Sequence, residues 1–169
     1  EYGGRKAGCH ATNLSRYPDS DGVALGNWLQ SQGFRHLGDR AGRWQLECYP
    51  HPALIEIFRL EERHLYKKGG VSQKRDGQIQ LANMLRRLGS SPVLALQIPE
   101  QFGAHFNQAR ISELRGGVLK HNEDALDAIV CLYIAGLYQA GYGSKVFGKA
   151  SDGYIYVPQV HCIKATGES

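Results

Sequence analysis

The segment from residue 122 to residue 140 constrains the fold of this chain more than any other, because apolar residues cover nearly every face of the helix that their spacing predicts. The apolar residues fall into a stripe at helical spacing and a second set on the other faces: Leu126, Val130, Tyr133 and Leu137, then Ile129, Leu132 and Ile134. A helix that is apolar on all sides is normally buried. Asn122 is its expected N-cap and Gly141 its expected stop, so we expect a core helix here.

Asp124 and Asp127 interrupt this apolar helix near its expected beginning. Their i, i+3 spacing places both side chains on one face, with Cβ atoms about 5–6 Å apart. Two neighbouring carboxylates in apolar surroundings repel each other and lose hydration, so their charge needs compensation. Three sources fit the sequence: the helix N-terminus, an Arg or Lys partner, or a divalent cation such as Mg²⁺ or Mn²⁺, which prefers carboxylate oxygens.

A third acidic residue, Glu47, lies at the C-terminal end of a strand-like run, just before Tyr49 and Pro50. Strand ends in α/β sheets gather ligand-binding residues, and alternation places Glu47 on the face opposite Leu46 and Cys48. A solvent-facing residue at a sheet edge is the alternative interpretation. A strand-end Glu together with a helix that carries two Asp is nonetheless what a two-metal phosphodiester hydrolase needs, since its carboxylates hold two cations about 3.5–4 Å apart.

The remaining periodicity predicts further helices and strands. Helices are expected over residues 21–32, about 52–60, about 73–88 and much of 93–115, and strands over 34–37, 44–49, 145–147 and 154–157. The first two strands are expected to pair as a hairpin around residues 38–42. Residues 1–20 and 61–72 are expected to be loops. Together these elements predict an α/β fold.

The composition is that of an ordinary globular domain, with 169 residues, 42% of them hydrophobic and 21% charged. No apolar run approaches the roughly 20 residues that a membrane helix needs, so none is expected. A formal charge of +4 is compatible with a polyanionic partner but is weak evidence for one. The four cysteines occur singly, without a C-x-x-C pair, which favours a reduced, cytoplasmic protein.

Four ordered motifs resemble the landmarks of a known family: Glu47-Cys48-Tyr49-Pro50-His51-Pro52-Ala53, Tyr66-Lys67-Lys68-Gly69, Glu123-Asp124-Ala125-Leu126-Asp127-Ala128, and Phe147-Gly148 followed by Gly153-Tyr154-Ile155-Tyr156-Val157-Pro158. This is a domain-of-unknown-function family of predicted nucleases with the RNase H-like fold. The last helix is also similar to that of the Holliday-junction resolvases of the same superfamily, which carry an Asp-x-x-Asp-Ala run. The resemblance extends from about Gly8 to Pro158, in a single domain expected over residues 1–169.

The resemblance implies an RNase H-like mixed sheet flanked by helices, and a nuclease that depends on Mg²⁺ or Mn²⁺. It implies that Glu47, Asp124 and Asp127 are catalytic acids that bind the metal. His121, at the expected entrance of the helix, would contact a phosphate or assist proton transfer; a surface histidine is the alternative. Three lysines would contact DNA or RNA: Lys67, Lys68 and Lys120. For Lys67 and Lys68, a solvated turn is the alternative interpretation.

One acid of this superfamily has no counterpart in the chain. The first strand of the superfamily's sheet supplies an essential metal-binding Asp, whereas no Asp precedes Asp19 here. Asp19 and Asp21 look like loop and helix-cap residues, and Asp39 falls in the expected hairpin turn. We therefore expect a sheet that is incomplete on its N-terminal side, with an exposed edge available for a homodimer. Catalysis is expected only if the missing Asp is supplied.

Two other classes of function fit the sequence. A non-catalytic nucleic-acid-binding or protein-interaction module would keep the fold without the chemistry. It predicts salt-sensitive binding without turnover, and Asp124 and Asp127 paired with Arg or Lys. The third class is a phosphate-handling metabolic enzyme on a related fold. The glycine pairs at 3–4, 69–70 and 116–117 lack the pattern of a phosphate-binding loop, which disfavours that class.

Overall fold

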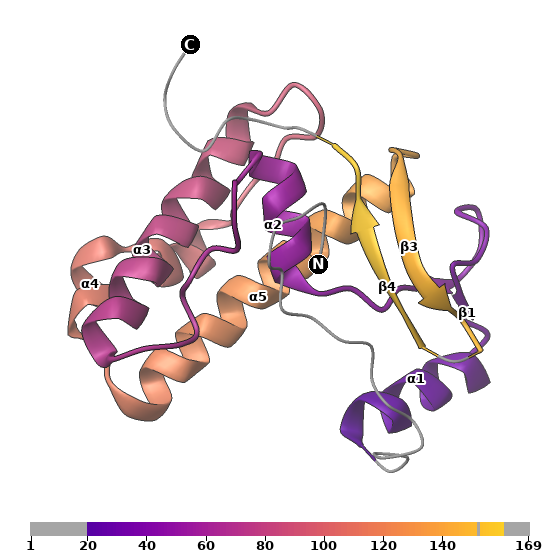
Figure 1. Ribbon diagram of the computed structural model, residues 1–169, viewed down its shortest axis with the longest axis horizontal. Helices are drawn as coiled ribbons and strands as arrows, with labels where there is room; N and C mark the ends of the chain where they lie inside the picture. Colours follow the sequence, from indigo (N-terminus) through magenta and orange to yellow (C-terminus); the bar gives the residue numbers. More distant parts are fainter. Residues whose placement is uncertain (1–19, 152, 161–169) are drawn as a thin grey trace.

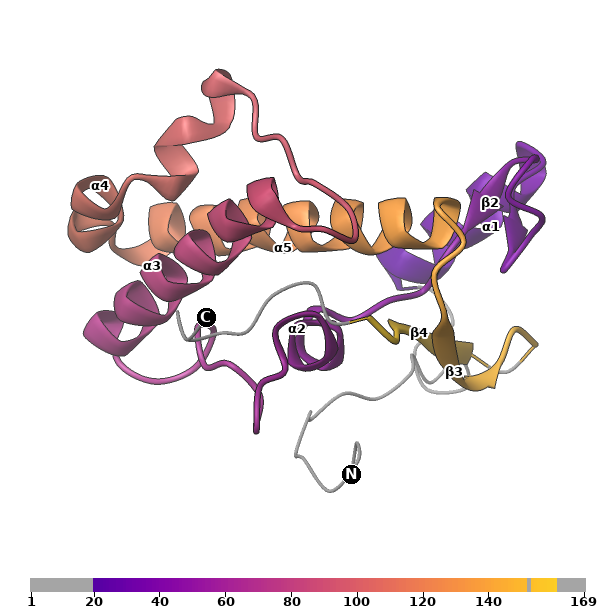
Figure 2. The ribbon, with the colours of Figure 1, turned by 90° about the horizontal axis from the view of Figure 1, so that it is seen from above.

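The structure is a computed structural model that describes residues 20–151 and 153–160. Helix α5 (Gly116–Gln139) crosses most of the molecule, as Figure 2 shows, and the other elements are arranged along it. Helix α2 (Pro50–Phe58) packs against α5, and all of its residues are buried. Helices and strands both contribute to the fold, which confirms the α/β class expected from the sequence.

The two ends of α5 have different neighbours. The other elements of the described residues, in chain order, are α1 (Asp21–Ser31), β1 (Arg35–His36), β2 (Trp44–Gln45), α3 (Val71–Arg87), the 3₁₀ helices η1 (Leu88–Ser90) and η2 (Glu100–Phe106), α4 (Gln108–Glu113), β3 (Ser144–Lys149) and β4 (Gly153–Pro158). Helices α3 and α4 lie at one end of α5, whereas α1 and the strands lie at the other (Figure 1). Within the described part of the chain, no helix is long and apolar enough to cross a membrane.

The predicted helices α1, α2 and α3 are confirmed, with ends that differ by about two residues from those expected. Pro50 begins α2, where its missing N–H costs no hydrogen bond. Arg59 ends it in the left-handed conformation, with φ at 53°. None of the residues of α1 is buried. The loop expected over residues 1–20 lies almost entirely outside the described residues, as do Asp19, Cys9 and Cys162.

Helix α5 begins at Gly116 rather than at Asn122, so the expected N-cap lies inside the helix. Asn122 is fully buried, and its amide nitrogen donates to Oε1 of Gln78 on α3 at 3.0 Å. Its amide oxygen accepts from Nη1 of Arg110 on α4 at 3.3 Å. These tertiary partners satisfy a polar side chain in the helix interior, so Asn122 does not have to end the helix.

The earlier start of α5 removes one of the three sources of charge compensation. Asp124 lies about two turns after Gly116, and Asp127 lies one turn further. The favourable effect of a helix N-terminus on acidic residues fades within the first turn. Other groups must therefore neutralise these carboxylates.

The strands expected near the C-terminal end of the domain are confirmed. Strand β3 pairs antiparallel with β4, and Val146 lies opposite Tyr156. The residues of β3 are exposed, whereas most of β4 is buried. A parallel bridge joins Cys48 to Tyr156, whose N–H donates to the carbonyl oxygen of Glu47 at 2.8 Å. The chain segment that ends at Glu47 therefore borders β4, while β3 forms the outer edge of this sheet in the described residues.

The predicted hairpin between the first two strands is wrong. Strands β1 and β2 pair in parallel, with Arg35 opposite Trp44. The chain turns at Leu37, where φ is 52°, and then folds back beside the start of β1. There the carbonyl oxygen of Arg43 accepts from the N–H of Arg35 at 3.1 Å. Because each strand has only two residues, the path of the connecting loop decides their direction.

The helix expected over much of 93–115 is only partly present, as η2 and α4. The first part of this segment is irregular, and tyrosine hydroxyls bind its carbonyl oxygens. Tyr133 on α5 donates to the carbonyl of Leu94 at 2.7 Å, and Tyr142 donates to that of Val93 at 2.5 Å. These contacts replace the hydrogen bonds that a helix would have made.

Candidate functional site

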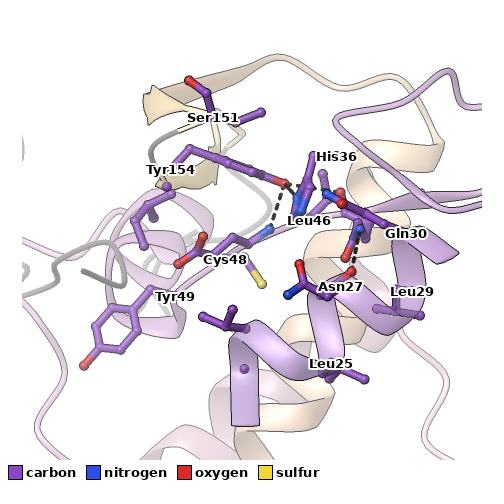
Figure 3. Close-up of a pocket in the computed structure, with 18 residues that line it drawn as sticks. Leu25, Asn27, Leu29, Gln30, His36, Leu46, Cys48, Tyr49, Ser151 and Tyr154 are labelled. Atoms are coloured by element: carbon purple, nitrogen blue, oxygen red, sulfur yellow. Dashed lines mark hydrogen bonds between the residues drawn. The ribbon is translucent and has the colours of Figure 1, made fainter. Parts of the chain in front are cut away.

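Glu47 borders a cavity of about 720 Å³ that α1 and the strand ends enclose (Figure 3). The N–H of Glu47 donates to the hydroxyl of Tyr154 at 3.0 Å, and Nδ1 of His36 lies 3.1 Å from the same hydroxyl. Burial is the main cause that raises the pKa of Tyr154 to about 12. The phenol therefore keeps its proton at neutral pH and can donate to the carbonyl oxygen of Gln45 at 3.2 Å.

The neighbouring residue, Cys48, interacts with Cys131 on α5. A hydrogen bond to Cys131, followed by burial, raises the pKa of the Cys48 thiol, and the same hydrogen bond lowers the pKa of Cys131. Cys131 lies one helical turn after Asp127. The hydrogen bond between Cys48 and Cys131 places the segment that carries Glu47 beside α5.

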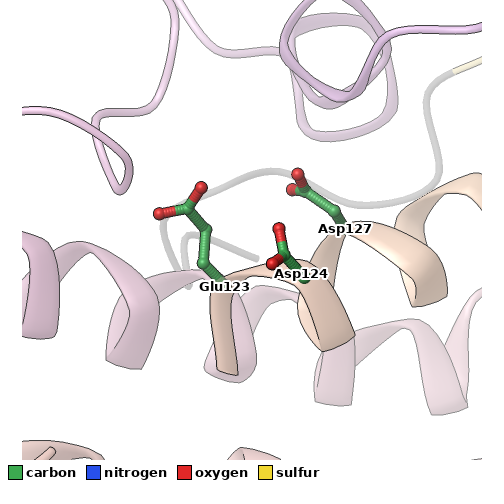
Figure 4. Close-up of side chains that lie close together, drawn as sticks. All are labelled: Glu123, Asp124 and Asp127. Atoms are coloured by element: carbon green, nitrogen blue, oxygen red, sulfur yellow. The ribbon is translucent and has the colours of Figure 1, made fainter. Parts of the chain in front are cut away.

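Three carboxylates converge on α5 (Figure 4). One oxygen each from Glu123, Asp124 and Asp127 lies within 4.8 Å of those of the other two. The side chain of Glu123 is 6% exposed, that of Asp127 is 21% exposed and that of Asp124 is 57% exposed. The structure thus brings the two predicted helix acids together and adds Glu123, while Glu47 is outside this group of three.

Lys120 neutralises two of the three acids. Its Nζ lies 2.7 Å from Oε1 of Glu123 and 2.7 Å from Oδ1 of Asp124. Hydrogen bonds to Asp124 and Glu123 raise the pKa of Lys120, so it stays charged. The lysine side chain is 60% exposed, and water and salt weaken ion pairs at such positions. Lys120 can therefore leave the exposed Asp124 at little energetic cost, whereas the nearly buried Glu123 needs another cation in its place.

Asp127 is held by two residues of the loop between α2 and α3. The hydroxyl of Tyr66 donates to Oδ1 at 2.6 Å, and Nζ of Lys67 donates to Oδ2 at 2.5 Å. Tyr66 is fully buried, and burial together with the charge of Asp127 raises the pKa of its phenol. The phenol is therefore a neutral donor, and Lys67 supplies the positive charge that balances Asp127.

Aromatic rings surround this lysine. Nζ of Lys67 lies 5.5 Å from the ring centre of Tyr49 and 5.2 Å from that of Tyr66, within the range of a cation–π interaction. The ring of His51 packs edge-on against both tyrosines, at 5.3 and 5.2 Å. Burial, and then the charge of Lys67, lowers the pKa of His51 to about 4. His51 is therefore neutral at pH 7, and Lys67 remains a localised charge in aromatic surroundings.

Close packing against α3 positions the loop that carries Tyr66. A Cβ atom at Gly77 would lie 2.1 Å from the carbonyl oxygen of Leu65 and 2.7 Å from Cα of Tyr66. Only glycine leaves room for this approach. The ring nitrogen Nε2 of His64 lies 2.7 Å from the carbonyl oxygen of Gly77 and fixes the loop a second time.

The other predicted site residues lie around the acids. His121 is exposed and lies inside α5, because the helix begins at Gly116; its expected place at the helix entrance is wrong. Its ring centre lies 6.0 Å from that of His105. Lys68 is exposed next to Lys67, and its charge contributes to the low pKa of His51.

Sequence reasoning missed Glu123 as a site residue, although its i, i+4 spacing from Asp127 places both on one helix face. Tyr66 appeared only within a motif, because no local pattern connects this tyrosine with Asp127. His51 was noted only as part of a motif, and its burial depends on tertiary packing that the sequence does not reveal.

Comparisons with known proteins give one match. A family model described as "Protein of unknown function (DUF429)" matches residues 10–152. No curated protein matches the chain, and no solved structure matches it either.

Proposed function

The chain belongs to the DUF429 family of proteins of unknown function, and we propose that it is a metal-dependent hydrolase of phosphodiester bonds in nucleic acid. The observation that carries this proposal is the convergence of Glu123, Asp124 and Asp127 on α5. Three carboxylate oxygens this close to one another fit the preference of Mg²⁺ and Mn²⁺ for oxygen ligands. The proposal includes the RNase H-like fold, and its support is the antiparallel pair β3–β4 next to α5 with the isolated parallel bridge from Cys48 to Tyr156.

The residues of α5 and the loop have distinct roles in this proposal. A bound divalent cation would polarise a phosphate oxygen and lower the pKa of a water molecule. Lys67 and Lys120, which neutralise the acids in this structure, would turn to the phosphate oxygens of the substrate. Tyr66 would hold the carboxylate of Asp127 in place. His121, exposed on the same helix, would exchange a proton with solvent or substrate.

We restrict the proposal to one cation. A two-metal mechanism needs carboxylates around two cations about 3.5–4 Å apart. Glu47 is outside the group that the three acids form, and its backbone is fixed by Tyr154 and Tyr156. A second cation and a ligand role for Glu47 therefore stay predictions, which Glu47→Gln tests.

The experiment combines cation binding with cleavage. Mn²⁺ binding is measured by calorimetry, and cleavage is measured on single-stranded, duplex and branched DNA and RNA with Mg²⁺ or Mn²⁺. We expect Asp124→Asn and Asp127→Asn each to weaken Mn²⁺ binding at least tenfold and to abolish cleavage. Asp76→Asn, at an exposed position on α3, serves as the control and should change neither. Cleavage that needs a cation but survives Asp124→Asn would refute the assignment.

A second function is favoured by a specific observation. Asp124 and Asp127 are both paired with lysines, as a non-catalytic nucleic-acid-binding module predicts. Such a module would bind nucleic acid in a salt-sensitive way, without turnover and without any effect of EDTA. The same calorimetry separates the two functions. The hydrolase predicts Mn²⁺ binding that Asp127→Asn weakens, whereas the non-catalytic module predicts that Asp127→Asn has no effect on Mn²⁺ binding.

A further inference from the structure

We propose that Lys67 and the divalent cation compete for Asp127, so that the cation and a phosphodiester bind cooperatively. This inference rests on the proposed function, in which the acids of α5 hold the cation. It adds a regulatory relationship: the site takes up its cation efficiently only when a phosphate group is present to accept Lys67.

The contacts of Asp127 make the competition direct. Oδ1 accepts from the hydroxyl of Tyr66 at 2.6 Å, and Oδ2 accepts from Nζ of Lys67 at 2.5 Å. The tyrosine is neutral and can stay when a cation arrives. The lysine is charged, and a divalent cation bound to the same carboxylate would repel it strongly at this distance. Cation binding to Asp127 therefore requires Lys67 to move.

Displacement leaves Lys67 in need of another anion. Its side chain is only 21% exposed, so the ammonium group is poorly compensated by water once it loses Asp127. The charges of Arg63 and Lys68 act on His51 together with that of Lys67, so positive charge gathers around this ring. In the described part of the chain, Asp127 is the acid that pairs with Lys67. A phosphate oxygen is a suitable replacement partner for this ammonium group.

The rings around Lys67 allow the movement to be small. Nζ lies over Tyr49 and Tyr66 at 5.5 and 5.2 Å, and cation–π attraction persists while the ammonium group turns from Asp127 towards solvent. Lys120 differs in this respect. At 60% exposure its ammonium group can return to water without a substitute anion once a cation binds Glu123 and Asp124. Lys67 is therefore the residue that couples the two ligands.

Linkage makes the coupling reciprocal: a factor by which phosphate tightens cation binding is also the factor by which the cation tightens phosphate binding. The test uses MnCl₂ as the cation and dimethyl phosphate as the simplest phosphodiester. For the unmodified protein, we expect saturating dimethyl phosphate to tighten Mn²⁺ binding by about tenfold, within the usual range of such couplings.

Lys67→Met removes the charge and keeps the apolar stem. We expect this variant to bind Mn²⁺ about tenfold more tightly than the unmodified protein without phosphate, and dimethyl phosphate to have a much smaller effect, because only the direct contact of phosphate with the cation remains. Lys67→Gln should behave in the same way and covers the case in which the methionine variant does not fold. The matched control is Lys145→Met on β3, since Nζ of Lys145 also lies over an aromatic ring, 5.0 Å from the centre of Phe147. It should retain the effect of phosphate.

Two results would overturn the inference, and they differ in what else they refute. If Asp127→Asn abolishes Mn²⁺ binding but Lys67→Met neither tightens it nor reduces the effect of phosphate, the cation site stands and the role of Lys67 is refuted. If Mn²⁺ binding is the same in the unmodified protein and in Asp127→Asn, the cation site itself is refuted, together with the proposed function.

Discussion

The hydroxyl of Tyr66 donates a 2.6 Å hydrogen bond to Oδ1 of Asp127, although 61 residues separate the two in the chain. A fully buried side chain thus fixes a carboxylate that is itself partly exposed. The bond joins the loop between α2 and α3 to α5. It makes the orientation of Asp127 a property of the packed core rather than of the helix alone.

Tyr66→Phe should destabilise the protein by about 1.5–3 kcal/mol, the usual contribution of a hydrogen bond to a charged group. It should also weaken Mn²⁺ binding, because Asp127 loses the donor that orients it. Urea unfolding measures the first effect and calorimetry the second.

Tyr142→Phe is the matched control for this change. Tyr142 donates to the carbonyl oxygen of Val93, a neutral acceptor away from the acids, at 2.5 Å. We expect a loss of about 1 kcal/mol and unchanged Mn²⁺ binding. Equal effects of the two variants on Mn²⁺ binding would show that Tyr66 does not position Asp127.

Gly77→Ala should destabilise the protein by about 1–3 kcal/mol, as overpacking typically does. The new Cβ would meet backbone atoms of Leu65 and Tyr66, which cannot turn aside as a side chain can. Either α3 or the loop must move, so Mn²⁺ binding through Asp127 should weaken as well. Circular dichroism during urea unfolding gives the free energy of unfolding.

Gly117→Ala tests the same substitution where there is room. A Cβ at Gly117 meets no atom within 4 Å, and the residue lies in α5. Alanine is favoured over glycine in a helix by about 0.5–1 kcal/mol, so this variant should be more stable than the unmodified protein. Equal destabilisation by both substitutions would contradict the close approach at Gly77.

The apolar stripe of α5 was predicted correctly, because Leu126, Val130, Tyr133 and Leu137 are all buried. The expectation that the helix is buried on all sides was wrong, since Leu132 is 64% exposed. The beginning of the helix was not predictable, since Asn122 has the preferences of a cap but finds its partners on α3 and α4. The pairing of Asp127 with Tyr66 and Lys67 was equally hidden. Such contacts depend on how distant segments pack, and local spacing carries no information about them.

Glu47 illustrates the same limit for the candidate site. The strand expected over 44–49 is shorter in the structure, where β2 ends at Gln45, so Glu47 lies two residues beyond the strand, and the parallel bridge of Cys48 to Tyr156 holds this segment beside β4. Whether Glu47 lies beside the α5 acids depends on which side chains of its segment face α5, and Cys48, which makes a hydrogen bond to Cys131, is one that does. One residue of register decides this, and the sequence does not reveal which face meets α5.

Asn122→Leu should destabilise the protein by about 3 kcal/mol. Leucine has a similar size but cannot donate to the amide oxygen of Gln78. It also removes Oδ1 of Asn122, which lies 3.0 Å from Nδ1 of His105. Unpaired buried polar groups cost about 1–3 kcal/mol each. His121→Asn, at an exposed position next to it, should change the free energy of unfolding by no more than about 0.5 kcal/mol. Similar effects of both changes would argue against a buried network around Asn122.

The buried ring of His51 should make stability depend on pH. Burial lowers the pKa of His51 to about 4 in the folded protein, against 6.5 for an ordinary histidine. Between these values the unfolded chain binds a proton that the folded protein does not, so stability is complete above pH 6.5 and decreases as the pH falls towards 4. His51 is 6% exposed, and its share of this loss of stability between pH 7.5 and 5.0 should be about 2 kcal/mol.

His64, whose pKa is also lowered by burial, acts in the same direction. Urea unfolding at the two pH values, compared between the unmodified protein and His51→Gln, isolates the contribution of His51. An unchanged difference between the two pH values in His51→Gln would mean that the ring is protonated as readily in the folded protein as in the unfolded chain.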